Sequence, residues 1–290
     1  MSMRMNRRGF LQTLAIGGGT LSAPSLVHAR QGKALSPGAL GLIYDATKCV
    51  GCKSCVIACK EVNAMPPEFS DPERIWDAPL GLSASTRNVI ALYKEGDRHS
   101  FIRQSCMHCV DPACVSACPV KALTKNQKTG IVQYDAGVCI GCRYCMVACP
   151  YNVPKFEWGK AYGKIVKCQL CDHLIAKGQR PGCSEACPTG AIQFGNVHDL
   201  LREAHHRLKA SPDVYYPKIY GEKDGGGTQL LMLSSMPFEK LGLPDLPETS
   251  TATLSETIMH TTYKGFAMPI FLFALFAFIT RRNFHKGGEE

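Results

Sequence analysis

Short runs of alternating hydrophobic and polar residues predict strands over much of the chain, joined by turns. Four of these runs predict two hairpins: residues 88–93 with 99–103 around the turn 95–97, and residues 123–124 with 131–134 around the turn 126–130. An apolar run at 191–194 predicts a further strand, and residues 196–210 after it are typical of a helix. The pattern therefore predicts an α+β fold.

One longer apolar run, residues 265–280, contains no charged residue and lies near the C-terminus. The run is short of the roughly 20 residues that cross a bilayer, but extension back to residue 258 gives about 23. Lys264 would then reach the interface with its long side chain. The pattern predicts a transmembrane helix over 258–280. Pro269 keeps open the alternative of a helix that docks on a partner.

Basic residues follow this run at once, in the tail 281–290, which contains Arg281, Arg282 and Lys286. Positively charged loops stay on the cytoplasmic side of a membrane, so the tail is expected in the cytoplasm and the preceding domain outside. For a bacterial protein, this orientation predicts a localisation on the periplasmic face of the inner membrane.

The N-terminal segment 1–29 has the features of an export signal. A basic beginning is followed by a moderately apolar stretch and by small residues, which predicts cleavage after Ala29. The segment resembles the twin-arginine export motif, carried here by Arg7, Arg8, Phe10 and Leu11. The resemblance implies export of an already folded protein, which suits a chain whose cofactor is inserted beforehand. The alternative is a chance pair of arginines in a flexible leader.

Composition narrows the function further. Of 290 residues, 33 are Lys or Arg and 24 are Asp or Glu, for a formal net charge of +9. The basic residues are dispersed and lack any recognition-helix or RNA-binding signature, which argues against a nucleic-acid-binding protein. With 45% hydrophobic and 20% charged residues, the chain is neither disordered nor a polytopic membrane protein. Its distinctive feature is its 16 cysteines.

The cysteines fall into four sets of four. The first and third sets share the spacing C-x2-C-x2-C-x3-C: Cys49, Cys52, Cys55 and Cys59, then Cys139, Cys142, Cys145 and Cys149. The second set has a longer middle gap: Cys106, Cys109, Cys114 and Cys118. The fourth set contains an 11-residue insertion: Cys168, Cys171, Cys183 and Cys187. Segments 49–59 and 139–149 match at every cysteine, glycine and alanine, so they form an internal repeat.

This spacing favours cubane 4Fe–4S clusters. A tight C-x2-C-x2-C loop wraps three thiolates around a cluster, and its glycines let the backbone bend close to the inorganic sulfide. In two-cluster ferredoxins the fourth cysteine of the run binds the other cluster. Zinc is the first alternative, but no histidine is in register, so it would need four all-cysteine sites. Disulfides are the second, although neighbouring cysteines in such loops are badly placed to pair.

The order of the sets predicts two interleaved two-cluster ferredoxin-like modules. Residues 106–162, which contain the second predicted hairpin, would close on themselves as an inner module. Residues 43–62 and 163–200 would then form a discontinuous outer module. The insertion 63–105 would be a docking surface for a catalytic partner, or plain scaffold. The C-terminal extension 201–257 contains a run rich in Pro, Gly and Thr, residues 211–253, which is expected to be an extended arm over the membrane partner.

The four-set arrangement resembles the electron-transfer subunits of membrane-bound respiratory enzymes of the formate dehydrogenase, dimethyl sulfoxide reductase and hydrogenase-2 types. The resemblance implies four 4Fe–4S clusters and the following ligand sets. Cluster 1 would be held by Cys49, Cys52, Cys55 and Cys187; cluster 2 by Cys59, Cys168, Cys171 and Cys183; cluster 3 by Cys106, Cys109, Cys114 and Cys149; and cluster 4 by Cys118, Cys139, Cys142 and Cys145.

Stretches outside the loops narrow the resemblance. Residues 104–112, 145–155 and 220–229 resemble the HybA-type subunit of hydrogenase-2. The resemblance implies a non-catalytic electron-transfer subunit that connects the large and small subunits of a nickel–iron hydrogenase to an integral membrane quinone-reactive subunit. One alternative is the equivalent subunit of a formate dehydrogenase or a molybdenum reductase. A second, of another class, is a metal-binding scaffold without a redox role.

Basic residues beside the loops form the last candidate group: Lys48, Lys53, Arg103, Arg143, Lys155 and Lys167. A positive charge near a cluster stabilises its reduced, more negative state and so raises its potential. For each of these residues taken singly, an ordinary solvated surface position is an equal expectation.

Overall fold

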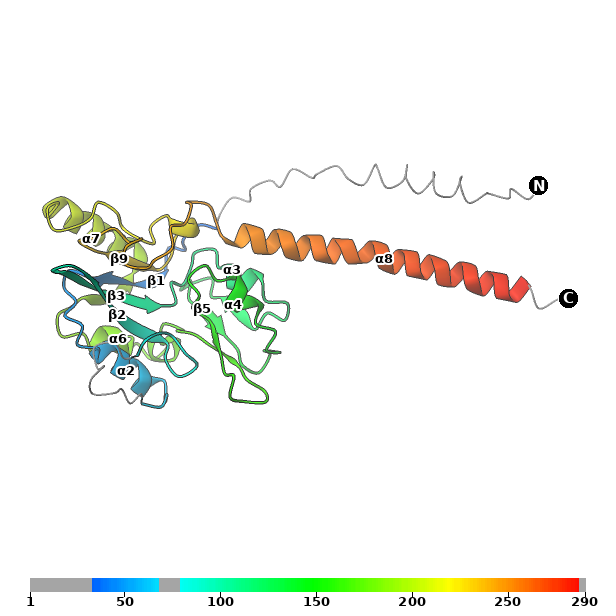
Figure 1. Ribbon diagram of the computed structural model, residues 1–290, viewed down its shortest axis with the longest axis horizontal. Helices are drawn as coiled ribbons and strands as arrows, with labels where there is room; N and C mark the ends of the chain where they lie inside the picture. Colours follow the sequence, from blue (N-terminus) through cyan, green and yellow to red (C-terminus); the bar gives the residue numbers. More distant parts are fainter. Residues whose placement is uncertain (1–32, 68–78, 287–290) are drawn as a thin grey trace. The chain divides into compact units, whose positions relative to one another are not determined.

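The largest sheet has three strands in the order β8–β1–β9, of which β1 and β9 are labelled in Figure 1. In this computed structural model, residues 33–67 and 79–286 are described. The central strand β1 (Leu40–Asp45) pairs antiparallel with β8 (Ile192–Asn196) and parallel with β9 (Leu230–Leu233). Residues far apart in the sequence therefore meet in one sheet. The predicted export signal 1–29 lies outside the described residues.

Both faces of this sheet are covered, which explains why β1 and β9 are almost entirely apolar. On one face, Ile43 packs with Leu231 against the helix α7 (Val197–Ala210). Asn196 caps this helix by accepting a hydrogen bond from the His198 backbone N–H at 2.9 Å. On the other face, Leu42 and Tyr44 join the main hydrophobic core. The predicted strand and helix at 191–210 are thus confirmed.

The first predicted hairpin is confirmed as β2 (Asn88–Glu95) and β3 (Arg98–Ser105). Its two-residue turn starts at Gly96, whose φ of 60° is the left-handed conformation that tight hairpins need. Ile90 and Ile102 from the two strands are buried in the main core. The hairpin therefore packs beside the central sheet and is not a separate appendage.

The second predicted hairpin is also confirmed, as β4 (Leu123–Lys125) and β5 (Val132–Tyr134). A third, smaller pair consists of β6 (Lys155–Phe156) and β7 (Ile165–Val166). The cysteine loops run into short helices: α2 (Ser54–Val62), α3 (Ala113–Ser116), α4 (Tyr144–Ala148), α5 (Asp172–Ile175) and α6 (Gly182–Glu185). The α+β class predicted from the sequence is confirmed.

The C-terminal extension differs from the arm expected from its composition. Its strand β9 is fully buried in the central sheet, and Phe238 and Leu241 are buried in the main core. A short 3-10 helix, η2 (Asp224–Gly226), precedes the strand. The extension therefore completes the main hydrophobic core. Its Pro and Gly residues lie in turns between packed segments.

The predicted transmembrane helix is wrong. The chain from Ala252 to Lys286 forms the helix α8, but within residues 33–67 and 79–286 no helix is long and apolar enough to cross a membrane. The uncharged run alone is too short, and its extension to residue 258 brings in His260, Thr261, Thr262 and Lys264. The localisation on the periplasmic face of the inner membrane, with an anchoring helix and a cytoplasmic tail, rested on this prediction and falls with it.

Candidate functional site

The two repeated cysteine loops adopt the same backbone conformation. Gly51 and Gly141 have φ of 69° and 70°, and Lys53 and Arg143 follow with φ of 60° and 64°. These left-handed residues turn the chain tightly just before α2 and α4 begin. Only glycine adopts such angles without cost, so the repeated glycine has a structural reason. Each loop therefore presents its first three cysteines around one point.

The first cavity of interest collects cysteines that are distant in sequence. It is lined by Cys49, Cys52 and Cys55 from the first loop and by Cys187, with Tyr44 and Pro188 beside them. Its volume is about 300 Å³. Cys187 lies just before β8, so the pairing of β8 with β1 brings this fourth thiol to the loop.

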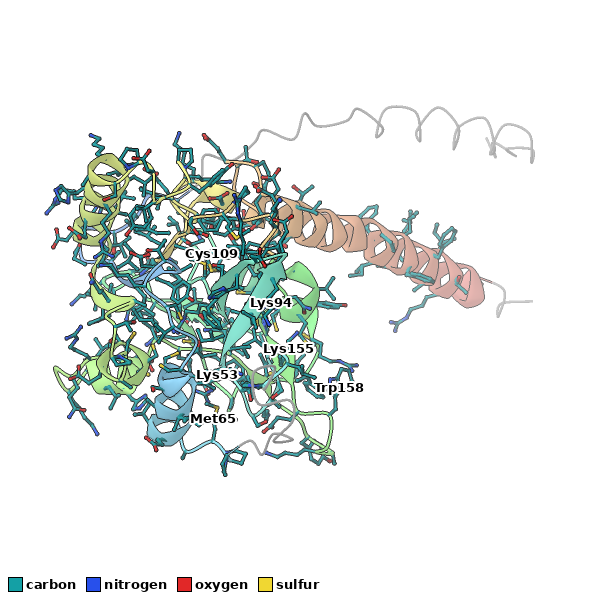
Figure 2. The ribbon with its side chains drawn as sticks, turned by 60° about the vertical axis from the view of Figure 1, so that its left-hand side comes forward. Lys53, Met65, Lys94, Cys109, Lys155 and Trp158 are labelled. Atoms are coloured by element: carbon teal, nitrogen blue, oxygen red, sulfur yellow. The ribbon has the colours of Figure 1, made fainter. Side chains whose placement is uncertain are left out.

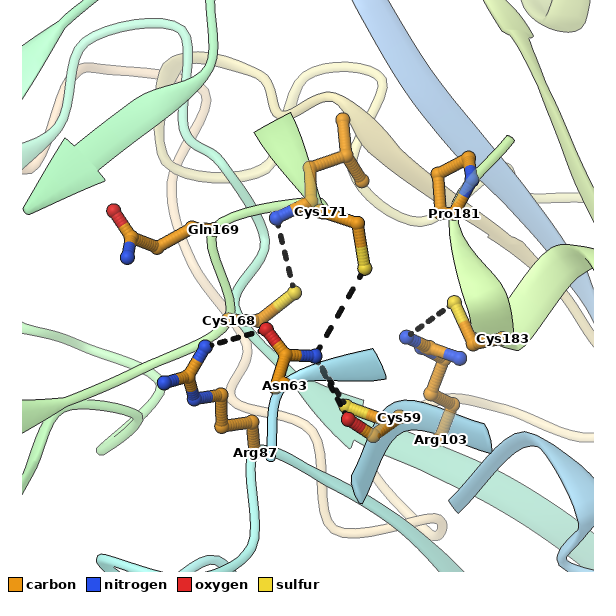
Figure 3. Close-up of a pocket in the computed structure, with 10 residues that line it drawn as sticks. Cys59, Asn63, Arg87, Arg103, Cys168, Gln169, Cys171, Pro181 and Cys183 are labelled. Carbon is orange, nitrogen blue, oxygen red and sulfur yellow. Dashed lines mark hydrogen bonds between the residues drawn. The ribbon is translucent and has the colours of Figure 1, made fainter. Parts of the chain in front are cut away.

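A second cavity, of about 320 Å³, is shown in Figure 3. Its thiols are those of Cys59, at the end of the first loop, and of Cys168, Cys171 and Cys183. The Arg103 side chain also lines it. Helices α2 and α6 pack against each other, which brings Cys59 to Cys183. This cavity therefore takes its fourth thiol from the neighbouring loop, the crossover pattern of two-cluster ferredoxins.

A third cavity, again of about 300 Å³, is lined by Cys118 together with Cys139, Cys142 and Cys145 of the second repeat. Each of the three cavities is thus lined by four thiols. Among the described residues, no three His, Cys, Asp or Glu side chains converge closely enough to hold a single metal ion.

The remaining thiols, Cys106, Cys109, Cys114 and Cys149, also lie close together. Burial raises the pKa of the first three thiols, and the nearby Cys149 raises each of them further. The structure thus brings the 16 cysteines together in the four groups that the resemblance implied. Which atoms they bind stays a prediction. From here on, sets 1 to 4 are the groups of thiols given above for clusters 1 to 4, and not the four sequence motifs.

The four sets follow one another in a line. Electrostatic effects between thiols connect set 1 to set 2 through Cys55 and Cys183, and set 2 to set 3 through Cys168 and Cys106. Sets 3 and 4 are connected through Cys114 and Cys145. The order along the molecule is therefore 1–2–3–4, although the sets interleave in the sequence.

Exposure differs between the middle and the ends of this line. Of the 16 cysteines, Cys52 and Cys142 are exposed, whereas the others are buried or half-buried. These two residues belong to set 1 and set 4, the terminal sets. Each end of the line thus has one exposed cysteine, and the two middle sets have none.

The cysteine sulfurs are surrounded by hydrogen-bond donors. Backbone N–H groups of Leu170 and Gly141 lie 3.3 and 3.4 Å from the sulfurs of Cys168 and Cys139. In set 2, the Asn63 side-chain amide lies 3.8 Å from Cys59 Sγ and 4.0 Å from Cys171 Sγ. Donors of this kind stabilise thiolates and tune the potential of clusters bound to them.

Burial strongly raises the pKa values of several cysteine thiols. Burial raises the pKa of Cys55 and Cys171 to about 11 and that of Cys145 to about 12. These groups are therefore neutral thiols near pH 7, and iron must displace their protons when it binds.

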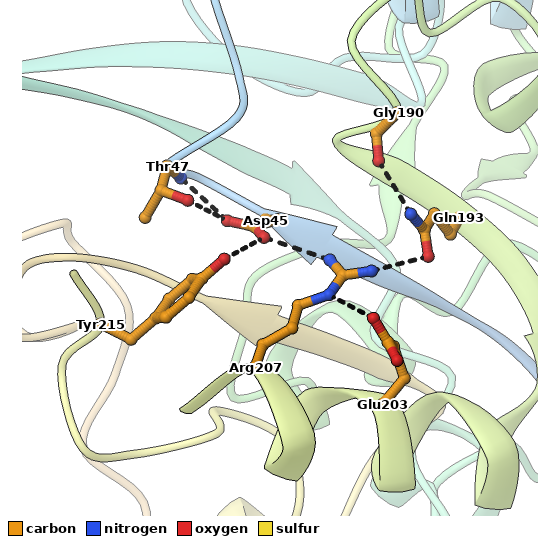
Figure 4. A network of polar contacts seen from close by, with 7 residues as sticks. All are labelled: Asp45, Thr47, Gly190, Gln193, Glu203, Arg207 and Tyr215. Atoms are coloured by element: carbon orange, nitrogen blue, oxygen red, sulfur yellow. Dashed lines mark hydrogen bonds and ion pairs between the residues drawn. The ribbon is translucent and has the colours of Figure 1, made fainter. Parts of the chain in front are cut away.

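A buried carboxylate that the sequence did not reveal fixes the entry to the first loop (Figure 4). Asp45 ends β1, is fully buried, and accepts hydrogen bonds from the Thr47 side chain at 2.6 Å and from the Tyr215 hydroxyl at 2.8 Å. Arg207 of α7 pairs with it at 3.1 Å. This network connects the loop to the helix and to the C-terminal extension. A sequence offers no sign of it because Arg207 and Tyr215 are more than 160 residues away from Asp45.

The six basic residues predicted beside the loops divide by burial. Arg103 and Lys167 are buried, at 1% and 3% exposure, whereas Lys48 and Arg143 are exposed and Lys53 and Lys155 half-exposed (Figure 2). The Arg143 guanidinium stacks on the surface rings of Phe156 and Trp158, 5.4 and 4.8 Å from their centroids. Only two of the six therefore act on the cysteines from inside the protein.

Two models of the 4Fe–4S dicluster domain match the chain, one over residues 41–119 and one over 98–197. The hydrogenase-2 operon protein HybA of Escherichia coli O157:H7 is 42% identical, over 99% of both chains. The chain belongs to the HybA-type 4Fe–4S dicluster family. The iron–sulfur subunit of the nitrate-inducible formate dehydrogenase of E. coli K12 is 32% identical over 85% of this chain and 84% of its own. The corresponding subunit of Haemophilus influenzae is 31% identical over 78% and 74%.

Family membership settles the cofactor. The matched domains are two-cluster domains, and together they cover all 16 cysteines, so this HybA-type protein carries four 4Fe–4S clusters. When bound, the clusters supply one-electron redox chemistry, and the chain supplies their thiolates, spacing and electrostatic surroundings. The chain is therefore a four-cluster iron–sulfur protein, similar along most of its length to HybA and to the iron–sulfur subunits of formate dehydrogenases.

Proposed function

We propose that this chain is the relay between a nickel–iron hydrogenase, made of a large and a small subunit, and an integral membrane quinone-reactive subunit. Electrons from hydrogen oxidation would pass along sets 1 to 4. The full-length similarity to HybA supports the hydrogenase as partner, because the formate dehydrogenase subunits are less similar and match less of the chain.

The observation that carries the relay is the line of four sets with exposed cysteines only at its ends. A relay needs closely spaced centres that are shielded from solvent, with one contact point for the donor and one for the acceptor. Cys52 in set 1 and Cys142 in set 4 provide these points. A metal-binding scaffold would need neither the linear order nor the two open ends.

Purification of the complex through a tag on this chain tests the partner. Nickel in the purified complex, together with hydrogen-dependent reduction of a quinone analogue, is the expected result. Molybdenum or tungsten in place of nickel would instead identify a formate dehydrogenase or molybdenum reductase. Iron far below four clusters per chain, with no signal on reduction, would favour a scaffold.

A further inference from the structure

Arg103 is a fully enclosed positive charge without a carboxylate partner among the described residues. Its side chain lies at the end of β3 and is 1% exposed. The Nε group donates to the Ser105 hydroxyl at 3.0 Å, and Nη2 donates to the sulfur of Cys183 at 3.5 Å. Nη1 is buried and has no hydrogen-bond partner in the described part of the chain. Burial of an unpaired guanidinium is costly, so another negative charge must compensate it.

The groups around Arg103 identify that negative charge. Burial alone would lower the pKa of the guanidinium, but the Cys183, Cys55 and Cys168 sulfurs outweigh burial and raise it. The positive charge in turn lowers the pKa of Cys55 in set 1 and of Cys59 in set 2, against the larger effect of burial. Arg103 thus lines the cavity of set 2, as Figure 3 shows, and its charge also reaches Cys55 of the neighbouring set 1.

Its position also separates it from the other cations near the cysteines. Lys167 is equally buried, but it acts on the thiols of set 3, Cys106, Cys114 and Cys149. Arg143 has the same place in the second repeat that Lys53 has in the first, and it lies on the surface over two aromatic rings. Water and salt screen a surface charge, whereas a buried charge acts at full strength over several ångströms.

We propose that Arg103 is a positioning and tuning residue shared by the clusters of sets 1 and 2, a fixed positive charge at their junction that raises both reduction potentials. Each cluster becomes more negative by one charge on reduction, so a nearby fixed cation favours the reduced form of either neighbour. The inference rests on the proposed relay and ligand sets.

The test is a redox titration of the purified full-length protein, followed by electron paramagnetic resonance, for the wild type, Arg103→Gln, Arg103→Lys and Arg98→Gln. Removal of the charge in Arg103→Gln is expected to lower two of the four midpoint potentials. The expected change is about tenfold or more in the ratio of oxidised to reduced cluster, or about 59 mV for one electron. Arg98 is an exposed arginine on the same strand, and Arg98→Gln, the matched control, is expected to leave all four midpoints in place.

The Arg103→Lys variant distinguishes the effect of the positive charge on the midpoint potentials from the effect of the shape of the arginine side chain. Retention of the positive charge predicts midpoints within about twofold of the wild-type ratio, even if Arg103→Gln loads its clusters poorly. A Lys variant that shifts like Gln would overturn the proposal, as would a shift of no midpoint, of one, or of all four in Arg103→Gln. The wild-type titration keeps this result separate from the proposed function, since a chain without four reducible clusters would fail there first.

Discussion

The two repeats, residues 45–59 and 135–149, have one local structure in two different settings. Each begins with an aspartate four residues before its first cysteine. Asp45 Oδ1 accepts from the Thr47 backbone N–H at 3.1 Å, and Asp135 Oδ1 accepts from that of Gly137 at 2.7 Å. The left-handed residues that follow have nearly equal φ angles. The shared cysteines, glycine and aspartate thus produce a similar loop at both places.

Beyond the loop the two repeats differ in degree of burial. The first is built more deeply into the core: Asp45 is fully buried, and the Phe101 ring of the hairpin packs on Gly51. The second is more exposed, since Val147 is 88% and Ile140 66% exposed, against 58% and 57% for the equivalent Ile57 and Val50. The cysteine motif therefore determines how a cluster is wrapped, and distant segments determine how strongly its surroundings act on it.

Loss of a crossover ligand is expected to have the largest effect, and a similar one in both repeats. Cys187 would complete set 1 and Cys118 set 4. Replacement of either by Ser is expected to remove about one cluster of the four, because a cubane needs four thiolates. Iron and sulfide analysis of each variant measures this loss.

Double variants test which thiols belong together. Cys187→Ser combined with Cys49→Ser is expected to lose no more iron than Cys187→Ser alone, because both residues would hold one cluster. Cys187→Ser combined with Cys168→Ser is expected to lose two clusters. The reverse outcome would show that Cys187 binds with its sequence neighbours and that the crossover is absent.

Alanine at the repeated glycine should distinguish the two settings. At both positions the left-handed backbone costs a side-chain-bearing residue about 1–2 kcal/mol. A Cβ at Gly51 would also lie 2.2 Å from the Phe101 ring, whereas at Gly141 the nearest atom is 3.4 Å away. Gly51→Ala is therefore expected to destabilise the loaded protein by about 1–3 kcal/mol more than Gly141→Ala. Denaturant unfolding under anaerobic conditions measures this difference, and equal losses would contradict it.

A smaller difference is expected at the two aspartates. Asp45→Asn removes the charge that pairs with Arg207 in a buried network, at an expected cost of about 1.5–3 kcal/mol. Asp135→Asn keeps the turn at an exposed position and is expected to change stability by less than about 0.5 kcal/mol. Thermal unfolding of both variants provides the comparison. A loss at Asp135 as large as that at Asp45 would show that the turn, and not the network, holds the loop.

Local signals in the sequence predicted the four cysteine motifs, both hairpins and the helix α7, because spacing and periodicity are local properties. The grouping of cysteines from different motifs came from the family resemblance. The strand β9 could not be predicted from the sequence. Four consecutive apolar residues fit a strand or a helix equally, and β9 pairs with a strand almost two hundred residues earlier. The burial of Arg103 and Asp45 depends on such long-range packing as well. The transmembrane prediction failed because it relied on extending a short apolar run through polar residues.

The central claim is a line of four redox-active clusters, and a reductive titration of the anaerobically purified full-length chain tests it most directly. We expect iron and sulfide for four clusters per chain and uptake of about four electrons. Magnetic interaction between neighbouring reduced clusters should appear in the electron paramagnetic resonance spectrum. Zinc in place of iron, uptake of fewer than four electrons by the fully loaded chain, or four magnetically isolated centres would contradict the account.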